Sequence, residues 1–170
     1  MNLAQFQWLQ STVAAAKGAG HIFPEMAGCE AALESSYGTS TLAREANNLF
    51  GMKQHAHPIF GTFHLPTNEF LSGQWKTVDA EWVKYPTVTE CFMDRMNTLD
   101  RLKKNYPHYM AALVAMNPIA YIYEVSKSWS TDPDRAMKVQ SIYNLYLAVL
   151  AKIPTGGTAE EVRSAAAAEN

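Results

Sequence analysis

Residues 31–53, AALESSYGTSTLAREANNLFGMK, carry the carboxylate of Glu34 where one helix ends and another begins. Pro24 fits the first turn of a helix that runs through Glu34, because proline favours that position. Gly38 is placed to adopt the left-handed conformation that ends such a helix. This stretch therefore decides how the chain is arranged around Glu34.

A short helix and a polar turn follow. Ser40 can cap a helix that extends through Ala46, since its side chain can accept a bond from a free backbone N–H. Asn47, Asn48 and Gly51 then have the residue types that form turns. The pattern predicts that two helices meet beside an Asn-rich loop.

Glu34 is predicted to lie in the last turn of its helix. The negative end of the helix dipole and burial against Leu33 and Tyr37 both disfavour an ionised carboxylate, so we expect a raised pKa and a general acid. A glutamate at a helix end can also make an ordinary surface contact. Glu30 lies one turn earlier on the same face, where it either assists Glu34 or faces solvent.

The stretch resembles the signature of the bacterial endo-β-N-acetylglucosaminidases of glycoside hydrolase family 73, which cut peptidoglycan. The resemblance implies that Glu34 is the catalytic acid. It extends over about 23–153 and implies a mainly α (α+β), lysozyme-like helical domain with a small β-hairpin lobe flanking a substrate groove. The matching positions are Glu34, Ser35, Tyr37, Gly38, Ser40, Leu42, Ala43, Asn47, Asn48, Leu49, Phe50, Gly51 and Lys53.

A β-hairpin is predicted after the Asn-rich loop. Residues 62–71 and 75–80 are rich in β-branched and aromatic residues on either side of Gly73. In the family this hairpin carries a Thr-x-Glu motif, and Thr67 and Glu69 match it. The resemblance implies that Glu69 assists Glu34, either as the base that activates water or by orienting a substrate whose own N-acetyl group attacks. Inversion and retention both stay open.

The chain departs from the family at three positions. Glu30 replaces a common Gln, Val83 replaces an Arg, and Trp129 in WSTDP replaces the Tyr of a Tyr-Ala-Thr-Asp-Pro motif. A tryptophan can stack on a sugar but has no phenol hydroxyl. Tyr121 or Tyr123 can supply that hydroxyl instead, although aromatic residues at helical spacing also pack in cores.

Eight residues are predicted to bind substrate, and packing in the fold is an equally valid reading for each. The aromatic residues that can stack on sugar rings are Tyr37, Phe50, Trp75 and Trp129. The polar residues that can hold acetamido or peptide groups are Asn47, Asn48 and Lys53. Tyr123 offers a hydroxyl.

Helical patterns account for much of the remaining chain. We predict helices from Asn2 to the Gly18 and Gly20 break, over 87–105 with a Thr87 capping box, over 109–116, and from Pro118 and from Pro133. Residues 1–154 form one catalytic domain in this reading. The Ala-rich residues 155–170 form a flexible C-terminal tail with little apolar surface to dock it.

Composition limits the function classes. The chain has 170 residues, of which 48% are hydrophobic and 18% charged, with a formal charge of −2. Such a chain suits one globular domain and argues against nucleic acid as a partner. Cys29 and Cys91 are predicted to be buried thiols or a single bridge. His55, His57 and His64 match a loop better than a zinc site, and we expect no metal and no cofactor.

The first residues have no basic leader, and no run is apolar enough to span a membrane. We therefore expect a monomer that acts on peptidoglycan in the bacterial periplasm or cell wall, after secretion, phage-type lysis or delivery by a secretion machine. A delivered effector implies a cognate immunity protein in the groove. The alternatives are a muramidase, a lytic transglycosylase, a catalytically silent wall-binding module, or a helical scaffold unrelated to sugars.

Overall fold

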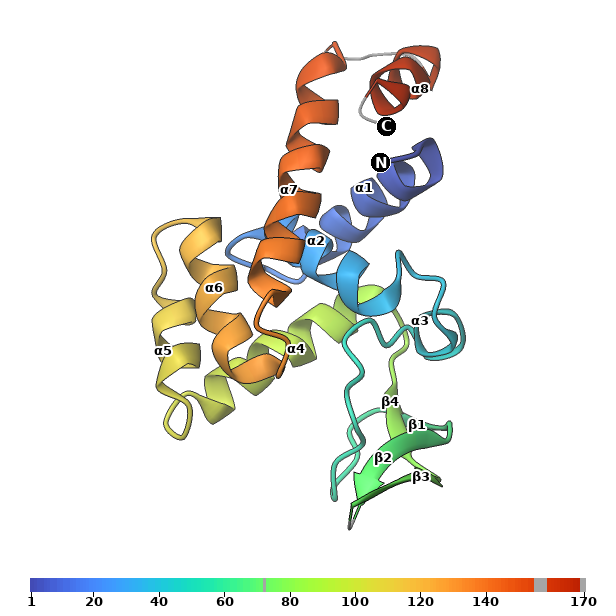
Figure 1. Ribbon diagram of the computed structural model, residues 1–170, viewed down its shortest axis with the longest axis vertical. Helices are drawn as coiled ribbons and strands as arrows, with labels where there is room; N and C mark the ends of the chain where they lie inside the picture. The colour runs from blue at the N-terminus through green and yellow to red at the C-terminus, as the bar shows by residue number, and fades with distance from the viewer. Residues whose placement is uncertain (72, 155–158, 169–170) are drawn as a thin grey trace.

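The computed structural model describes residues 1–71, 73–154 and 159–168, and within these the side chains of 68–71 and 159 are not described. Helices dominate, and two small antiparallel sheets project from them (Figure 1). We call β1 to β4 the β-lobe, and α1, α2 and α4 to α8 the helical body. The elements in chain order are α1 (Leu3–Gly18), α2 (Pro24–Ser35), α3 (Thr41–Ala46), β1 (Gly61–His64), β2 (Thr67–Leu71), β3 (Gln74–Val78), β4 (Glu81–Lys84), α4 (Val88–Leu102), α5 (Pro107–Leu113), α6 (Pro118–Trp129), α7 (Arg135–Lys152) and α8 (Ala159–Ala167).

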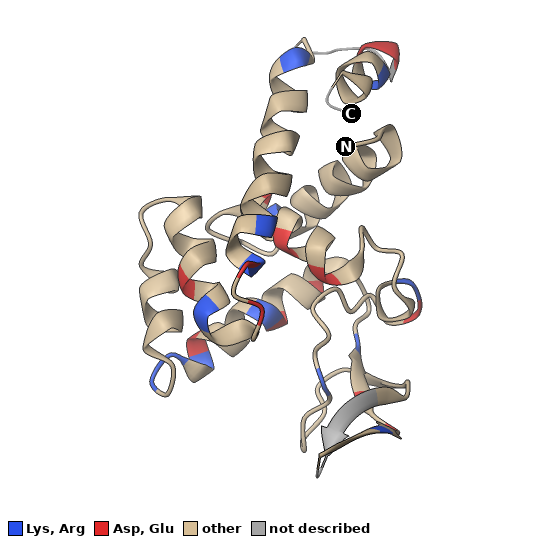
Figure 2. Cartoon of the chain, viewed as in Figure 1, with Lys and Arg blue, Asp and Glu red and all other residues tan. Residues whose placement is uncertain are grey.

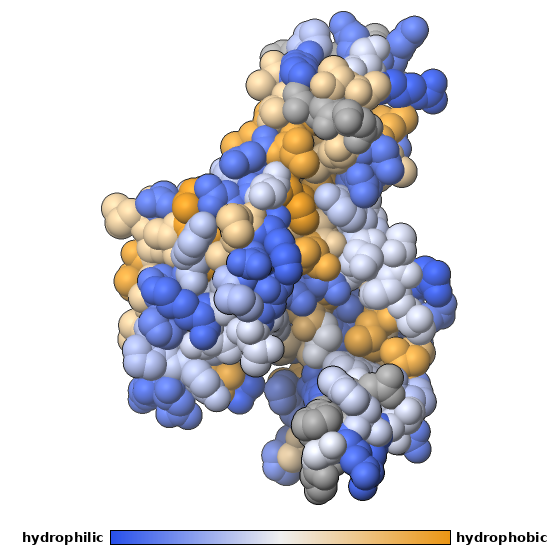
Figure 3. Space-filling model, in the orientation of Figure 1, coloured by the Kyte–Doolittle hydropathy of each residue, from blue (hydrophilic) through white to orange (hydrophobic). Residues whose placement is uncertain are grey.

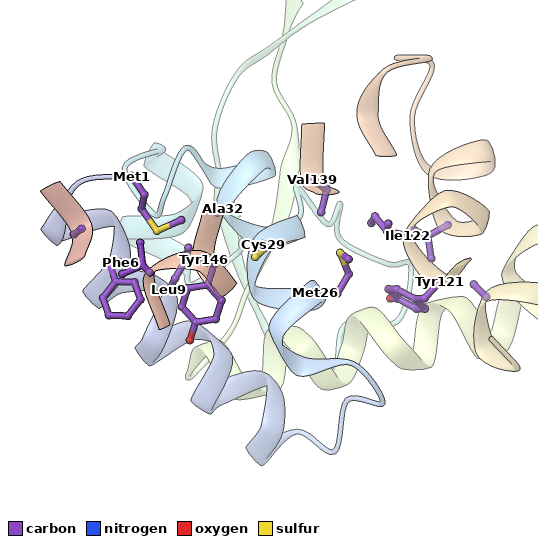
Figure 4. Packing of buried hydrophobic residues seen from close by; sticks show 14 of the residues in the cluster. Met1, Phe6, Leu9, Met26, Cys29, Ala32, Tyr121, Ile122, Val139 and Tyr146 are labelled. Carbon is purple, nitrogen blue, oxygen red and sulfur yellow. The ribbon is translucent and has the colours of Figure 1, made fainter. Parts of the chain in front are cut away.

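Helix α2 is the central element of the body. It packs against α1, α6 and α7, and its Met26 and Cys29 lie between aromatic residues of α1 and α7 on one side and residues of α6 on the other (Figure 4). Pro24 occupies the first turn, as predicted. The left-handed conformation that ends α2 begins at Ser36 (φ 51°), two residues before the predicted Gly38. The carboxylate-bearing end of α2 is thus fixed between packed helices.

The β-lobe is more divided than predicted. The expected hairpin exists as β2 paired with β3, from Thr67 opposite Val78 to Leu71 opposite Gln74. The predicted first strand is broken at Pro66, and β1 pairs instead with β4. Proline has no N–H to donate to a ladder, which explains the interruption. The lobe consequently consists of two short ladders in series.

Helix starts agree better with prediction than helix ends. Asn2 forms a capping box with Gln5, Ser40 caps α3 and Asn117 caps α6. Helix α4 ends at Leu102, earlier than predicted, and Pro107 begins α5 where a start at 109 was expected. The proline explains the second correction, because its fixed φ suits the first helical turn.

The C-terminal prediction of a frayed tail is wrong for residues 159–167. They form α8, which contacts α1 and α7, and its Ala165 and Ala166 are buried in the core. Figure 1 shows α8 beside the start of α1, with the two chain ends close together. Small alanine side chains let α8 approach its neighbours closely, which compensates for the lack of large apolar residues.

The two thiols are free and lie in separate core clusters. Burial raises the pKa of Cys29 and of Cys91 to about 12. The buried-thiol reading is therefore confirmed over the bridge. Within the described residues, no helix is both long enough and apolar enough to cross a membrane.

Candidate active site

Helix α2 presents two carboxylates, one turn apart, to different surroundings. Glu30 is only 1% exposed, whereas the side chain of Glu34 is 26% exposed near the end of the helix. The open alternative that Glu30 faces solvent is therefore wrong. A buried carboxylate needs charged partners, because desolvation of an isolated ion is costly.

Arg135, the first residue of α7, joins the two carboxylates. Its Nη2 donates to Glu30 Oε1 at 2.6 Å, and its Nε and Nη2 both lie 2.7 Å from Glu34 Oε1. Its Nη1 donates to Ser126 Oγ at 2.8 Å. Glu34 Oε2 has no hydrogen-bond partner among the residues that the structure describes. One oxygen of Glu34 is thus anchored, and the other stays available.

Arg95 of α4 completes the cluster from the opposite side. Its Nη2 donates to Glu30 Oε1 at 2.7 Å, and its guanidinium lies 3.4 Å from the ring centroid of Trp129 and 5.4 Å from that of Phe50. Its Nε and Nη1 have no hydrogen-bond partner among the described residues. Cation–π contact with two rings offsets part of the cost of burying this charge.

The electrostatics of this cluster favour its charged forms. Burial alone would raise the pKa of Glu30, but the guanidinium groups of Arg95 and Arg135 outweigh it and hold the pKa well below its usual value. Burial disfavours the charged form of Arg135, but the two carboxylates outweigh it and raise its pKa. Figure 2 shows acidic and basic positions meeting where α2, α4 and the start of α7 converge.

Sequence reasoning missed both arginines, and it described the surroundings of Glu34 as apolar. Arg135 is brought to Glu34 only by the packing of α7 on α2. A signal for Arg95 existed, because it follows Phe92 by three residues and precedes Leu99 by four on the apolar face of α4. A charged residue on an apolar helix face predicts a buried ion pair. The partner of Arg95 is Glu30, whose surroundings the sequence had left open.

A pocket of about 350 Å³ lies beside the cluster, where α6 connects to α7. Tyr123, which is 43% exposed, lines it together with Ser126 and the segment 130–133. Ser126 also accepts the Arg135 hydrogen bond. Tyr121 is buried and hydrogen-bonded to His21, so Tyr123 is the tyrosine whose hydroxyl can reach a ligand.

The Asn-rich loop is occupied with structural contacts. Asn48 is buried, its Nδ2 donates to the carbonyls of Met52 and Val83, and its Oδ1 accepts from the N–H of Met52. Asn47 donates to the carbonyl oxygens of Tyr85 and Pro86. These amides fasten the loop after α3 to β4 and to the segment that follows β4, and a substrate role for them stays a prediction.

The predicted stacking residues are dispersed. Phe50 is buried against Phe92, and Tyr37 packs edge-on to Trp8 at 6.0 Å. One face of Trp129 is covered by Arg95. Of the predicted stacking residues, the largely exposed ring is Trp75, at 73%, on β3. The structure brings Phe50 and Trp129 together around Arg95 and leaves Trp75 out in the lobe.

Lys53 lies at the base of the lobe, with its Nζ 5.7 Å from the ring centroid of Trp82. Glu69 lies in β2, where its backbone pairs with that of Lys76. The side chain of Glu69 is outside the described residues, so its role beside Glu34 remains a prediction. The space-filling view shows a notch between the β-lobe and the helices facing it (Figure 3).

The three histidines of the middle segment are spread over loop and strand. His55 and His57 line a surface pocket with Asp94 and Arg101 of α4, and His64 of β1 lies 4.0 Å from a carboxylate oxygen of β4. Among the described residues, no group of three or more potential metal-ligating side chains of the His, Cys, Asp or Glu type is found.

A mainly helical body, a small β-lobe and a partly exposed glutamate anchored at the end of a central helix are features of lysozyme-like glycoside hydrolases. The family model of the glucosaminidases, described as mannosyl-glycoprotein endo-beta-N-acetylglucosaminidase, matches residues 10–148. The chain belongs to this family, glycoside hydrolase family 73, and is a glycoside hydrolase domain.

Relatives of known name support this assignment. The chain is 33% identical over 136 residues to the exo-glucosaminidase LytG of Bacillus subtilis, covering 74% of this chain and 45% of that protein. It is 29% identical over 152 residues to a probable N-acetylmuramidase of Lactococcus lactis, covering 82% of this chain and 33% of that protein. The chain thus spans less than half the length of these relatives.

Solved structures share the fold. The catalytic domain of the autolysin Auto from Listeria monocytogenes aligns with a TM-score of 0.73 at 22% identity, over 86% of each chain. A C-terminally truncated glycoside hydrolase domain of Salmonella typhimurium FlgJ aligns with a TM-score of 0.69 at 25% identity, over 85% of this chain and 98% of that one. A chain of a type VI secretion system effector-immunity complex from Pseudomonas protegens aligns with a TM-score of 0.52 at 17% identity, over 98% and 96%.

Proposed function

We propose that this domain hydrolyses peptidoglycan at the β-1,4 bond that follows N-acetylglucosamine, with Glu34 as the general acid. The observation that carries the proposal is the state of this side chain. It is partly exposed at the end of α2, with Oε1 held by Arg135 and Oε2 without a partner among the described residues. Membership of the glucosaminidase family supports the reaction class.

The chemistry needs one proton and one water molecule. Glu34 Oε2 gives its proton to the glycosidic oxygen as the bond from that oxygen to C1 breaks, and positive charge develops on the sugar. Water attacks C1, and its proton passes to a base. Glu69 is our candidate for that base, because β2 belongs to the lobe that faces the body. Attack by the substrate's own N-acetyl group is the alternative in which Glu69 only orients.

The sugar contacts follow from exposure. Trp75 on the lobe and Tyr123 at the pocket beside α7 are the aromatic candidates for contact with glycan. Lys53 lies at the base of the lobe, where it can meet an acetamido or peptide group. The other candidates act in this proposal through packing and hydrogen bonds inside the fold, not through contact with glycan. They are Asn47, Asn48, Phe50 and Trp129.

The test is mass spectrometry of fragments that the protein releases from purified sacculi. New reducing N-acetylglucosamine ends support the proposal, reducing N-acetylmuramic acid ends indicate a muramidase, and anhydro ends indicate a lytic transglycosylase. The muramidase outcome is a real competitor, because named relatives divide between the two activities. Pelleting with sacculi without any released fragment would instead identify a silent binding module.

The Glu34→Gln variant tests the residue. We expect a loss of about 1,000-fold in rate with an unchanged fold, because a general acid contributes about 10²- to 10⁴-fold. Glu25→Gln at the other end of α2 is the matched control and should retain activity. An active Glu34→Gln protein would end the assignment.

We also propose that the protein acts in the bacterial periplasm or cell wall as a delivered antibacterial effector, with an immunity protein that occupies the groove. The fold shared with a chain of a type VI effector-immunity complex motivates this. Targeting the domain to the periplasm of a Gram-negative host should cause lysis, and Glu34→Gln should abolish it. Lysis that the variant still causes would contradict an enzymatic toxin.

A further inference from the structure

Arg135 is 1% exposed, so its side chain cannot reach a glycan strand in the groove. Any effect that it has on the reaction must pass through a neighbour. Its contacts with Glu34 are a hydrogen bond from Nε–H to Oε1 and an ion-pair contact of Nη2, which lies 2.7 Å from the same oxygen. A charge-assisted pair of this kind fixes orientation as well as supplying energy.

We infer that Arg135 is a positioning residue for proton transfer by Glu34, and that Glu30 is the buried anchor that holds Arg135 in place. This rests on the proposed function. With Oε1 hydrogen-bonded to Nε and ion-paired with Nη2 of the guanidinium, the transferable proton is carried on Oε2, the oxygen without a described partner. When that proton leaves with the glycosidic oxygen, the new carboxylate charge forms beside a guanidinium that is already in place.

The anchor explains why Arg135 cannot turn away from Glu34. Glu30 Oε1 accepts from Arg135 at 2.6 Å and from Arg95 at 2.7 Å, and Ser126 takes the remaining terminal nitrogen of Arg135. Residues of four elements therefore meet in this cluster: α2, α4, α6 and α7. A side chain bonded on three sides in the core keeps one orientation.

A purely structural ion pair is the competing explanation, and charge balance allows a clean test. Without Arg135, the buried set is still one carboxylate, Glu30, and one guanidinium, Arg95, while Glu34 is partly solvated. Arg135→Gln should therefore fold, whereas removal of Glu30 leaves two buried guanidinium groups facing each other. This makes Arg135 the better position to change.

The experiment compares kcat and KM on soluble glycan fragments for the wild type, Arg135→Gln, Arg135→Lys and the control Lys138→Gln. Lys138 is a cation on the same helix whose partner is the surface residue Asp132. We expect Arg135→Gln to lose about 100-fold in kcat with KM within about threefold, since misplacing a catalytic group by about 1 Å costs that much. Arg135→Lys should recover part of the loss, because it restores the charge but not the two-pronged contact, and Lys138→Gln should match the wild type.

Activity of folded Arg135→Gln within threefold of the wild type would overturn the inference, as would a loss confined to KM. The NMR signal of the Arg135 Nε–H group in full-length protein provides a test that does not depend on that variant folding. The signal should be protected from exchange with solvent, and its chemical shift should change in Glu34→Gln. An unchanged chemical shift in that variant would contradict the coupling between Arg135 and Glu34. Wild type that releases nothing from sacculi defeats the proposed function instead, so the two failures are distinct.

Discussion

The helical body and the β-lobe differ in whether their polar residues are buried or exposed. In the body, Arg95 and Arg135 are buried, and both are bonded to the buried Glu30. In the lobe, β3 is exposed along most of its length, and within the described side chains Val83 of β4 is the buried strand residue. The body therefore fixes the side chain of Glu34 in place, while the lobe is built from short strands with little buried surface among its described side chains.

The largest effect that separates the two regions should come from Glu30→Ala. It leaves two buried guanidinium groups without their shared counter-charge, so we expect a loss of about 3–5 kcal/mol in the free energy of unfolding. Urea denaturation measures it. Glu81→Ala in the lobe, where the carboxylate is exposed, is the control and should change stability by less than about 0.5 kcal/mol. Equal losses of stability in Glu30→Ala and Glu81→Ala would show that the buried cluster does not stabilise the fold more than an exposed carboxylate does.

A second prediction concerns the pH dependence of the body. Burial lowers the pKa of His21 to about 4, and its Nδ1 accepts the Phe23 N–H, so protonation would break that bond. The unfolded chain then binds a proton at a higher pH than the folded chain does. Stability should therefore fall as the pH drops from 6.5 to about 4, by about 3 kcal/mol from this group. Thermal unfolding across that range checks it, and His21→Gln should flatten the curve; an unchanged slope would contradict the assignment.

Two glycines with positive φ sharpen the comparison further. A Cβ at Gly38 would lie 2.2 Å from Nε1 of Trp8, whereas a Cβ at Gly73 in the lobe meets nothing within 4 Å. Both alanine variants incur the left-handed conformational cost of about 1 kcal/mol, and Gly38→Ala adds overpacking of about 2 kcal/mol. Chemical denaturation of the pair measures the difference. If the two variants lose equal stability, the Trp8 side chain can move aside for the added Cβ at little cost, which would contradict the overpacking prediction.

The smallest effect on stability is expected at Trp75. Its ring is largely exposed, so Trp75→Ala should change the free energy of unfolding by less than about 0.5 kcal/mol. Loss of a stacking surface should nevertheless raise KM for glycan fragments about tenfold, which corresponds to about 1.4 kcal/mol. Trp8→Ala in the body should show the reverse pattern, with a large loss of stability. An unchanged KM for Trp75→Ala would remove the lobe ring from the substrate site.

Local signals in the sequence predicted much of the fold. Helix caps and helix-starting prolines depend on backbone groups only a few residues away, so they can be predicted without a tertiary structure. The examples here are the caps Asn2, Ser40 and Asn117 and the proline Pro24. Ends were harder to place, as at Leu102, because helices end where packing ceases to support them. The docking of α8 was missed for the same reason, since Ala165 and Ala166 are buried only when α1 and α7 are present.

The amino-acid sequence by itself determined the family, the helix that carries Glu34, and the hairpin that carries Glu69, because motif spacing and capping are properties of neighbouring residues. Only the tertiary structure decided the surroundings of Glu34. Arg135 follows it by 101 residues along the chain and reaches it because two helices pack side by side. Partners of a buried charge are chosen by which helices meet, and no local pattern records that choice.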